Sequence, residues 1–138
     1  MHYDNVTEFS IYLADKPGAL ACVLEAATIE GVHVQAVTVG DSHGSGLIRL
    51  VGNDAEALRQ VCEQLVHAGG GPVTEATVLA VDVSERPNAF RDIVSQFASD
   101  GVNVKYAYQA PQLNGSPARC IFRVEEPDMA TKSLDTLG

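Results

Sequence analysis

Apolar residues alternate along two segments that lie 70 positions apart and that each precede a proline, Pro17 or Pro87. A period of two is typical of β-strands with one face in a core. The apolar positions are Phe9, Ile11 and Leu13 in the first segment and Leu79, Val81 and Val83 in the second. The match in spacing predicts an internal repeat.

A helix is predicted after each proline, because apolar residues recur there at the i, i+3, i+4, i+7 spacing of one helix face. The two stripes are Leu20, Val23, Leu24 and Ala27, and Phe90, Ile93, Val94 and Phe97. Each helix is predicted to end at a glycine, Gly31 or Gly101, because glycine readily takes the left-handed conformation. A second strand then begins at Val32 or Val102.

Each copy continues with a polar turn, a third strand at 47–51 or 119–124, and a second helix. The second stripes are Leu58, Val61, Cys62 and Leu65, and more weakly Ala130, Ser133, Leu134 and Leu137. The apolar stretch 73–83 is long for one strand, so we interpret it as two strands in series, with the second copy beginning its strand near Val78. The prediction is two units, 1–72 and 73–138.

The second copy has no fourth strand after its last helix. A sheet edge at that position exposes unpaired backbone groups. We therefore expect this edge to be open, covered, or completed by another segment.

Composition excludes several classes of function. Of the 138 residues 46% are hydrophobic and 20% charged, which is typical of a globular protein with a core. The net charge of −9, without a Lys/Arg cluster, argues against a nucleic-acid partner. The apolar runs are too short to cross a bilayer and no leader follows Met1, so we expect a cytoplasmic protein that does not bind membranes.

Three widely spaced cysteines, Cys22, Cys62 and Cys120, predict neither a disulfide framework nor a zinc site. We expect Cys22 and Cys62 to be small buried hydrophobic residues. No metal or other cofactor is expected.

Asp41, Ser42 and His43 are adjacent in a glycine-rich loop, with no further ligand or base nearby to complete a metal or catalytic site. A solvated hairpin connection is the favoured interpretation. Tyr106 and Tyr108 alternate along a strand and are predicted to share one face, either the helix-covered face or the outer one. No nucleophile–base pair or paired carboxylates stand at a shared turn, so the chain is not expected to be an enzyme.

The strand–helix–strand–strand–helix–strand order, with Asp-Lys-Pro-Gly-Ala-Leu at 15–20 and Gly-Val-His-Val at 31–34, resembles the ACT domain family. Glu-Arg-Pro-Asn-Ala-Phe at 85–90 and Gly-Val-Asn-Val at 101–104 repeat the outline. The resemblance implies an α+β fold of two ferredoxin-like βαββαβ units paired side by side, with helices on antiparallel sheet and the second unit lacking its last strand. It also implies a free-standing tandem that binds an amino acid where units meet.

Helix-opening N–H groups near Gly18 are suited to a ligand carboxylate, and Asp15 to its ammonium group. In the family a polar residue, often Asn, follows the helix-ending glycine by two positions and bonds the ligand; here it is His33 or Asn103. The contact residues implied by the resemblance are Leu13, Asp15, Pro17, Gly18, Ala19, Leu20, His33, Glu85, Asn88, Ala89, Phe90, Asn103 and Val104.

Neither copy keeps both family features, because the first has Gly18 with His33 and the second has Asn88 with Asn103. Family sites commonly join the turn of one unit to the polar residue of its neighbour. The hypothesis is one good site that combines Asp15 and Gly18 with Asn103. Simpler interpretations remain open: Asp15 as a helix cap, Gly18 as relief of crowding, and Asn103 as a partner of a local backbone group.

The leading hypothesis for function is a regulatory, amino-acid-binding protein, expected to be a homodimer with a metabolic enzyme as a possible partner. The alternative is an oligomerisation or enzyme-docking module that binds no ligand. The open edge of the second copy favours this alternative slightly.

Overall fold

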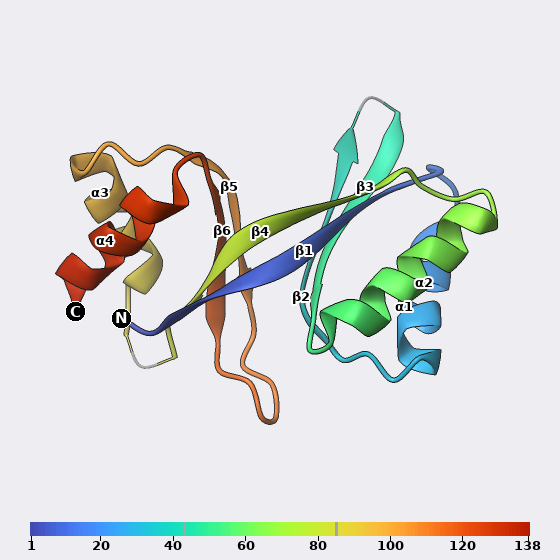
Figure 1. Cartoon of the computed structure of the whole chain (residues 1–138), viewed down its shortest axis with the longest axis horizontal. Coiled ribbons are helices and arrows are strands. Elements are labelled where there is room, and N and C mark those ends of the chain that lie inside the picture. The colour runs from blue at the N-terminus through green and yellow to red at the C-terminus, as the bar shows by residue number, and fades with distance from the viewer. Residues whose placement is uncertain (43, 85) are drawn as a thin grey trace. The chain divides into compact units, whose positions relative to one another are not determined.

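The computed structural model describes residues 1–42, 44–84 and 86–138, and the chain forms two compact units (Figure 1). The first unit consists of Thr7–Ala76, and the second joins Met1–Val6 to Thr77–Gly138. The predicted division at 72/73 assigned the whole N-terminal strand to the first unit. In the structure the start of that strand belongs with the C-terminal half of the chain.

The first unit is a four-stranded sheet with two helices, in the order β2-β3-β1-β4. Its elements are the later part of β1 (Tyr3–Leu13), α1 (Ala19–Ile29), β2 (Val34–Ser42), β3 (Ser45–Gly52), α2 (Ala55–His67) and the start of β4 (Val73–Asp82). Strands β1 and β2 both pair antiparallel with β3, so that Ile11 and Val39 flank Ile48. The Tyr12 N–H donates to the Pro72 carbonyl at 3.0 Å, where β1 meets β4.

The second unit repeats this topology in the order β5-β6-β4-β1. Its elements are the start of β1, the later part of β4, α3 (Ala89–Ser99), β5 (Val104–Ala110), β6 (Arg119–Val124) and α4 (Pro127–Leu137). The Asp82 N–H donates to the His2 carbonyl at 2.9 Å. The edge left open by the sequence is therefore completed by another segment, residues Met1–Val6.

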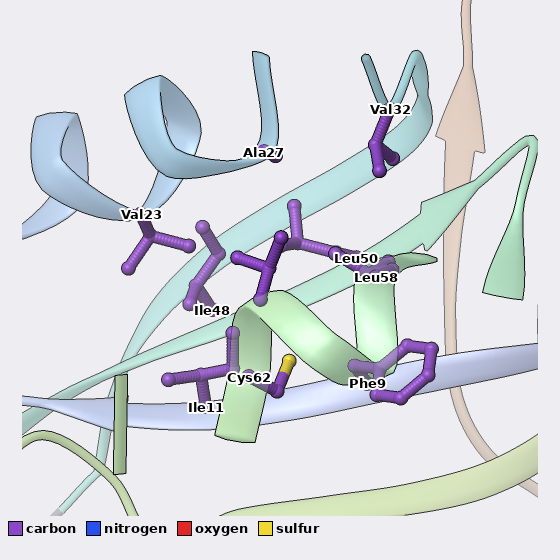
Figure 2. Packing of buried hydrophobic residues seen from close by; sticks show 10 residues of the cluster. Phe9, Ile11, Val23, Ala27, Val32, Ile48, Leu50, Leu58 and Cys62 are labelled. Carbon is purple, nitrogen blue, oxygen red and sulfur yellow. The ribbon is translucent and has the colours of Figure 1, made fainter. Parts of the chain in front are cut away.

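The core of the first unit lies between its helices and one face of its sheet, as Figure 2 shows. Phe9, Ile11 and Leu50 from the sheet are fully buried. They meet Val23 and Ala27 of α1, as the helical stripe predicted. The other buried members of this core are Val32, Ile48, Leu58, Val61 and Cys62.

The core of the second unit is built around Phe122, whose ring meets Phe97 edge-on at 5.3 Å and stacks on Phe90 at 5.7 Å between centroids. The α3 stripe is confirmed at Ile93 and Phe97, but Phe90 and Val94 remain 36% and 37% exposed. The buried face of α3 is centred on Ile93 and Phe97, so Phe90 and Val94 lie at the border of that face.

Both predicted helix ends are confirmed, because Gly31 and Gly101 have φ values of 77° and 75°. The N–H of Val32 returns to the Ala27 carbonyl, and that of Val102 to Phe97, at 2.9 and 2.8 Å. These are the backbone contacts of a Schellman motif, which needs a left-handed residue.

The prediction that Cys22 is buried is wrong, because its side chain is exposed on α1, whereas Cys62 and Cys120 are buried. Burial raises the pKa of the Cys62 and Cys120 thiols to about 11. Since the thiolate is the reactive form, these two thiols are unreactive near neutral pH.

Replacing Tyr3 tests the shared N-terminal strand, because Tyr3 packs on the core of the second unit. Tyr3→Ala is expected to lower the free energy of unfolding by about 1–2 kcal/mol through lost apolar burial. Asn5→Ala, at an exposed position on the same strand, is the control and is expected to change little. Equal effects in urea unfolding of the two variants would contradict this assignment.

Candidate functional site

The turn between β1 and α1 brings the chain into the helix through a left-handed glycine. Gly18 is the N-cap of α1 with φ 89° and ψ −14°. Among the described residues no side chain caps this end, and no acidic residue lies in the first turn of α1. Asp15 is exposed and does not act as the cap, so the capping interpretation of this residue is wrong.

Backbone N–H groups at this turn remain available to a ligand. The Cys22 N–H donates to the Gly18 carbonyl at 3.0 Å, which closes the first helical turn. The first N–H groups of an α-helix have no partner inside the helix, and here these include the N–H groups of Leu20 and Ala21, which precede Cys22. The helix dipole adds partial positive charge at the same place, so this end of α1 favours a carboxylate.

A hollow of about 280 Å³ lies beside the turn. Its charged lining residues are Asp15, Lys16 and Asp41, and its apolar side includes Leu20 and Val39. Three of the predicted contact residues besides Asp15 line it: Leu13, Ala19 and Leu20. The hollow combines carboxylates for an ammonium group with nearby helix-opening amides for a carboxylate.

A larger groove of about 660 Å³ lies against the same turn and shares Leu13, Lys16 and Ala19 with the smaller hollow. It extends toward Cys22 and the loop 69–72. None of its described lining residues is acidic, so it offers no side chain to balance a ligand's ammonium group.

The matching turn of the second unit is less suited to a carboxylate. Asn88 is its N-cap with φ 63°, and no described side chain caps α3. Asp92 lies in the first turn of α3, where its carboxylate already occupies the helix N-terminus and pairs with Arg91 at 3.0 Å. Ala89 is buried and Phe90 stacks on Phe122, while Glu85 lies outside the described residues.

His33 lies at the other end of α1 from the turn. It borders a separate hollow of about 440 Å³ together with Leu24 and Thr28. Because α1 has 11 residues, its ends are about 16 Å apart. The first unit therefore does not bring its own turn and His33 together.

The backbones of His33 and Asn103 have the same structural role in the two units. The His33 carbonyl accepts from the Asn53 N–H at 3.0 Å, and the Asn103 carbonyl accepts from the Glu125 N–H at 3.1 Å. Both side chains are exposed, whereas Val104 is half-buried in the second core. Backbone pairing at this position leaves its side chain available for other contacts.

The sequence did not identify Lys16, Val39 and Asp41 as part of the site. Asp41 was assigned only to a solvated loop, although it belongs to β2 and lines the hollow beside the start of α1. The hairpin itself is confirmed by the antiparallel pairing of Ser42 with Ser45, and His43 lies outside the described residues.

Strand register places Tyr106 and Tyr108 on the outer face of the second sheet. Tyr108 lies opposite Ile121, one residue along from Phe122, which faces the helices. Successive side chains alternate between faces, so the tyrosines point away from α3 and α4.

The described residues contain no group of three or more His, Cys, Asp or Glu side chains placed to hold a metal ion. In the same part of the chain, every helix is too short or too polar to cross a bilayer.

These features define a tandem of ferredoxin-like units, in which no described side chain caps the helix that follows the first strand. The sequence model of the ACT domain pair matches residues 4–135. The chain therefore belongs to the ACT domain family, which is regulatory rather than catalytic. A search of curated proteins finds no match.

Solved structures share this fold. Protein BT0572 from Bacteroides thetaiotaomicron aligns with a TM-score of 0.79 at 20% identity, over 97% of this chain and 89% of that one. The ligand-free regulatory subunit of aspartate kinase from Thermus thermophilus aligns with a TM-score of 0.66 at 18% identity, over 98% of this chain and 94% of that one. Aspartokinase III from E. coli, in complex with lysine and aspartate, aligns with a TM-score of 0.57 at 16% identity. The alignment covers 98% of this chain and 32% of that enzyme.

Substitution of Gly18 tests the left-handed turn. Gly18→Ala is expected to lower the free energy of unfolding by about 1 kcal/mol, because a β-carbon strains the left-handed conformation even though it meets open space here. Gly18→Asn is expected to cost less, since asparagine tolerates this conformation and occupies it at position 88. Chemical denaturation of both variants measures these two free energies of unfolding. A Gly18→Ala variant as stable as the parent would contradict the turn geometry.

Proposed function

We propose that this protein is a regulatory amino-acid sensor, with the ligand bound at the β1–α1 turn of the first unit. The ligand carboxylate accepts hydrogen bonds from the helix-opening amides near Gly18, and its ammonium group pairs with Asp15 and Asp41. The observation that supports this most directly is the helix N-terminus without a side-chain cap beside a hollow with two carboxylates.

The remaining contacts are proposed to come from another ACT unit. His33 lies at the far end of α1 from the turn of its own unit, so a ligand at that turn needs a polar partner from elsewhere. Asn103 is such a residue, as is His33 of a second copy of the chain. A homodimer in the cytoplasm is part of this proposal.

Regulation is proposed to act because the bound ligand stabilises one arrangement of the ACT units, within the chain or in a dimer, relative to another. A ligand shifts such an equilibrium only as far as its affinities for the two states differ. The regulated partner is proposed to be a metabolic enzyme, since two similar folds belong to aspartate kinases. The alternative is a docking module without a ligand, which the exposed apolar side chains of Cys22 and Ile29 on α1 favour. Thermal unfolding with amino acids separates the two.

Thermal unfolding with each of the twenty amino acids tests the ligand. At 100 times its dissociation constant a bound amino acid adds about 2.7 kcal/mol of stability and raises the melting temperature. Calorimetry with that amino acid should give one strong site per chain, because Asp92 and Phe90 disfavour the second turn. No shift with any amino acid, or two equal sites per chain, would contradict the proposal.

Matched variants locate the site. Asp15→Asn and Asp41→Asn should each weaken binding about tenfold or more, because a charge-assisted hydrogen bond is lost. Glu30→Gln, an exposed acid at the other end of α1, should bind as the parent does. Equal affinity in all three variants would place the ligand elsewhere.

A further inference from the structure

The start of β4 has an unpaired edge. In the strand order β4 lies between β1 and β6, but its pairing with β6 covers only Leu79–Asp82. Residues 73–76, which read Val-Thr-Glu-Ala, therefore have β1 on one side and no described strand on the other. An unpaired edge offers backbone N–H and C=O groups to another strand.

The register of β4 shows which of its residues point to this edge. The Pro72 carbonyl accepts from the Tyr12 N–H of β1, so the backbone of residue 72 points to β1. At another even-numbered residue, the Asp82 N–H also donates to the N-terminal segment. Backbone groups of successive residues alternate in direction along a strand. Val73 and Glu75 therefore each present an N–H and a C=O group to the open edge.

A hollow of about 280 Å³ lies beside this edge, between α2 and the start of β4 (Figure 1). Its apolar lining includes Phe9, Val66 and Val73. Val73 and Glu75 line the hollow with their side chains and the open edge with their backbones. A strand added to the edge would therefore place alternate side chains over the hollow.

Ion pairs around Arg59 form one wall of the hollow. The Arg59 guanidinium donates twice to the Glu75 carboxylate, at 2.9 and 2.8 Å, and also pairs with Glu56. Its central carbon lies 5.7 Å from the centroid of the Phe9 ring. The bonds to Glu75 raise the pKa of Arg59, and the same bonds lower the pKa of Glu75. Arg59 is thus already neutralised and does not offer its charge to an anion.

Glu63 supplies the uncompensated charge of the hollow. It lines the hollow one turn along α2 from Arg59 and forms no ion pair within the part of the chain that the structure describes. The hollow therefore has an excess of negative charge above an apolar floor. A lysine or arginine side chain suits these surroundings, because its aliphatic stem packs on apolar surface while its charged head stays outside.

We propose that an extended segment of a partner protein adds to the β4 edge at 73–76 and places a lysine or arginine side chain in the hollow, with its charged group at Glu63. In such strand additions main-chain hydrogen bonds give affinity and side-chain pockets give specificity. A second copy of β4 is a poorer occupant, because antiparallel pairing centred on this edge would bring two Glu75 carboxylates together. The inference uses no residue of the proposed ligand site, so it stands or fails separately from amino-acid binding.

NMR titration of the nitrogen-labelled full chain with an acetylated and amidated peptide, Thr-Val-Thr-Lys-Thr-Val-Thr, tests the proposal. The largest amide shifts should fall on Val73 and Glu75, with Gly18 unchanged. The same peptide with glutamate in place of lysine should bind about tenfold more weakly or worse, because it brings a like charge to Glu63. Shifts confined to other elements, or equal binding of the two peptides, would overturn the proposal.

Variants of α2 test the charge in the hollow. Glu63→Gln should weaken the lysine peptide about tenfold, and Glu63→Lys should reverse the preference in favour of the glutamate peptide. Gln64→Lys is the control, because it changes the net charge as much as Glu63→Gln does, at an exposed position outside the lining of the hollow. It should bind as the parent does, and melting temperatures check that all three variants fold. Equal weakening by Glu63→Gln and Gln64→Lys would contradict the assignment.

Two N-methylated forms of the lysine peptide test main-chain pairing. Methyl groups on alternate residues block the N–H groups along one edge of an extended peptide and leave the other edge intact. One form should lose binding and the other should keep it, whereas equal affinities would contradict strand addition. A disulfide between copies of a Thr74→Cys variant, without binding of any peptide, would identify a second copy as the occupant and overturn the proposal.

Discussion

The hydrogen bonds between β1 and β4 are the interaction on which both units depend. Each unit needs a fourth strand, and each obtains it by sharing these two long strands. The Tyr12 N–H bonds the Pro72 carbonyl in the first unit, and the Asp82 N–H bonds the His2 carbonyl in the second. Because single strands continue from one unit into the other, neither half of the sequence contains a complete sheet. The duplication in the sequence is therefore not a duplication of independent domains.

Strand β1 also positions the proposed site. Strand β1 ends at Leu13, and the left-handed Gly18 opens α1 without a cap from any side chain that the structure describes. The antiparallel path of β2 and β3 brings Asp41 to the same end of the sheet. In the second unit an asparagine takes the place of the glycine, and an acid enters the first helical turn. The two turns therefore differ in the residues that open their helices, and only the first is proposed to bind an anion.

Local patterns predicted most of the fold. Helix-ending glycines and alternating strands are set by neighbouring residues, so Gly31, Gly101 and the strand from Phe9 to Leu13 were identified correctly. The N-terminal segment was not assigned to the second unit, because strand exchange depends on contacts far apart in the sequence. The position of Asp41 beside the start of α1 was not predicted for the same reason, since it follows from sheet topology. The exposure of Cys22 was missed because apolar surroundings in the sequence were interpreted as core.

Amide NMR spectra of the nitrogen-labelled protein, titrated with the amino acid that most raises its melting temperature, would show whether the β1–α1 turn binds the ligand. If the helix-opening amides bind the ligand carboxylate, the largest shifts should fall on Gly18, Leu20 and Ala21, with smaller ones at Asp41. Shifts concentrated on α2 or in the second unit, with the turn unchanged, would contradict binding at this turn.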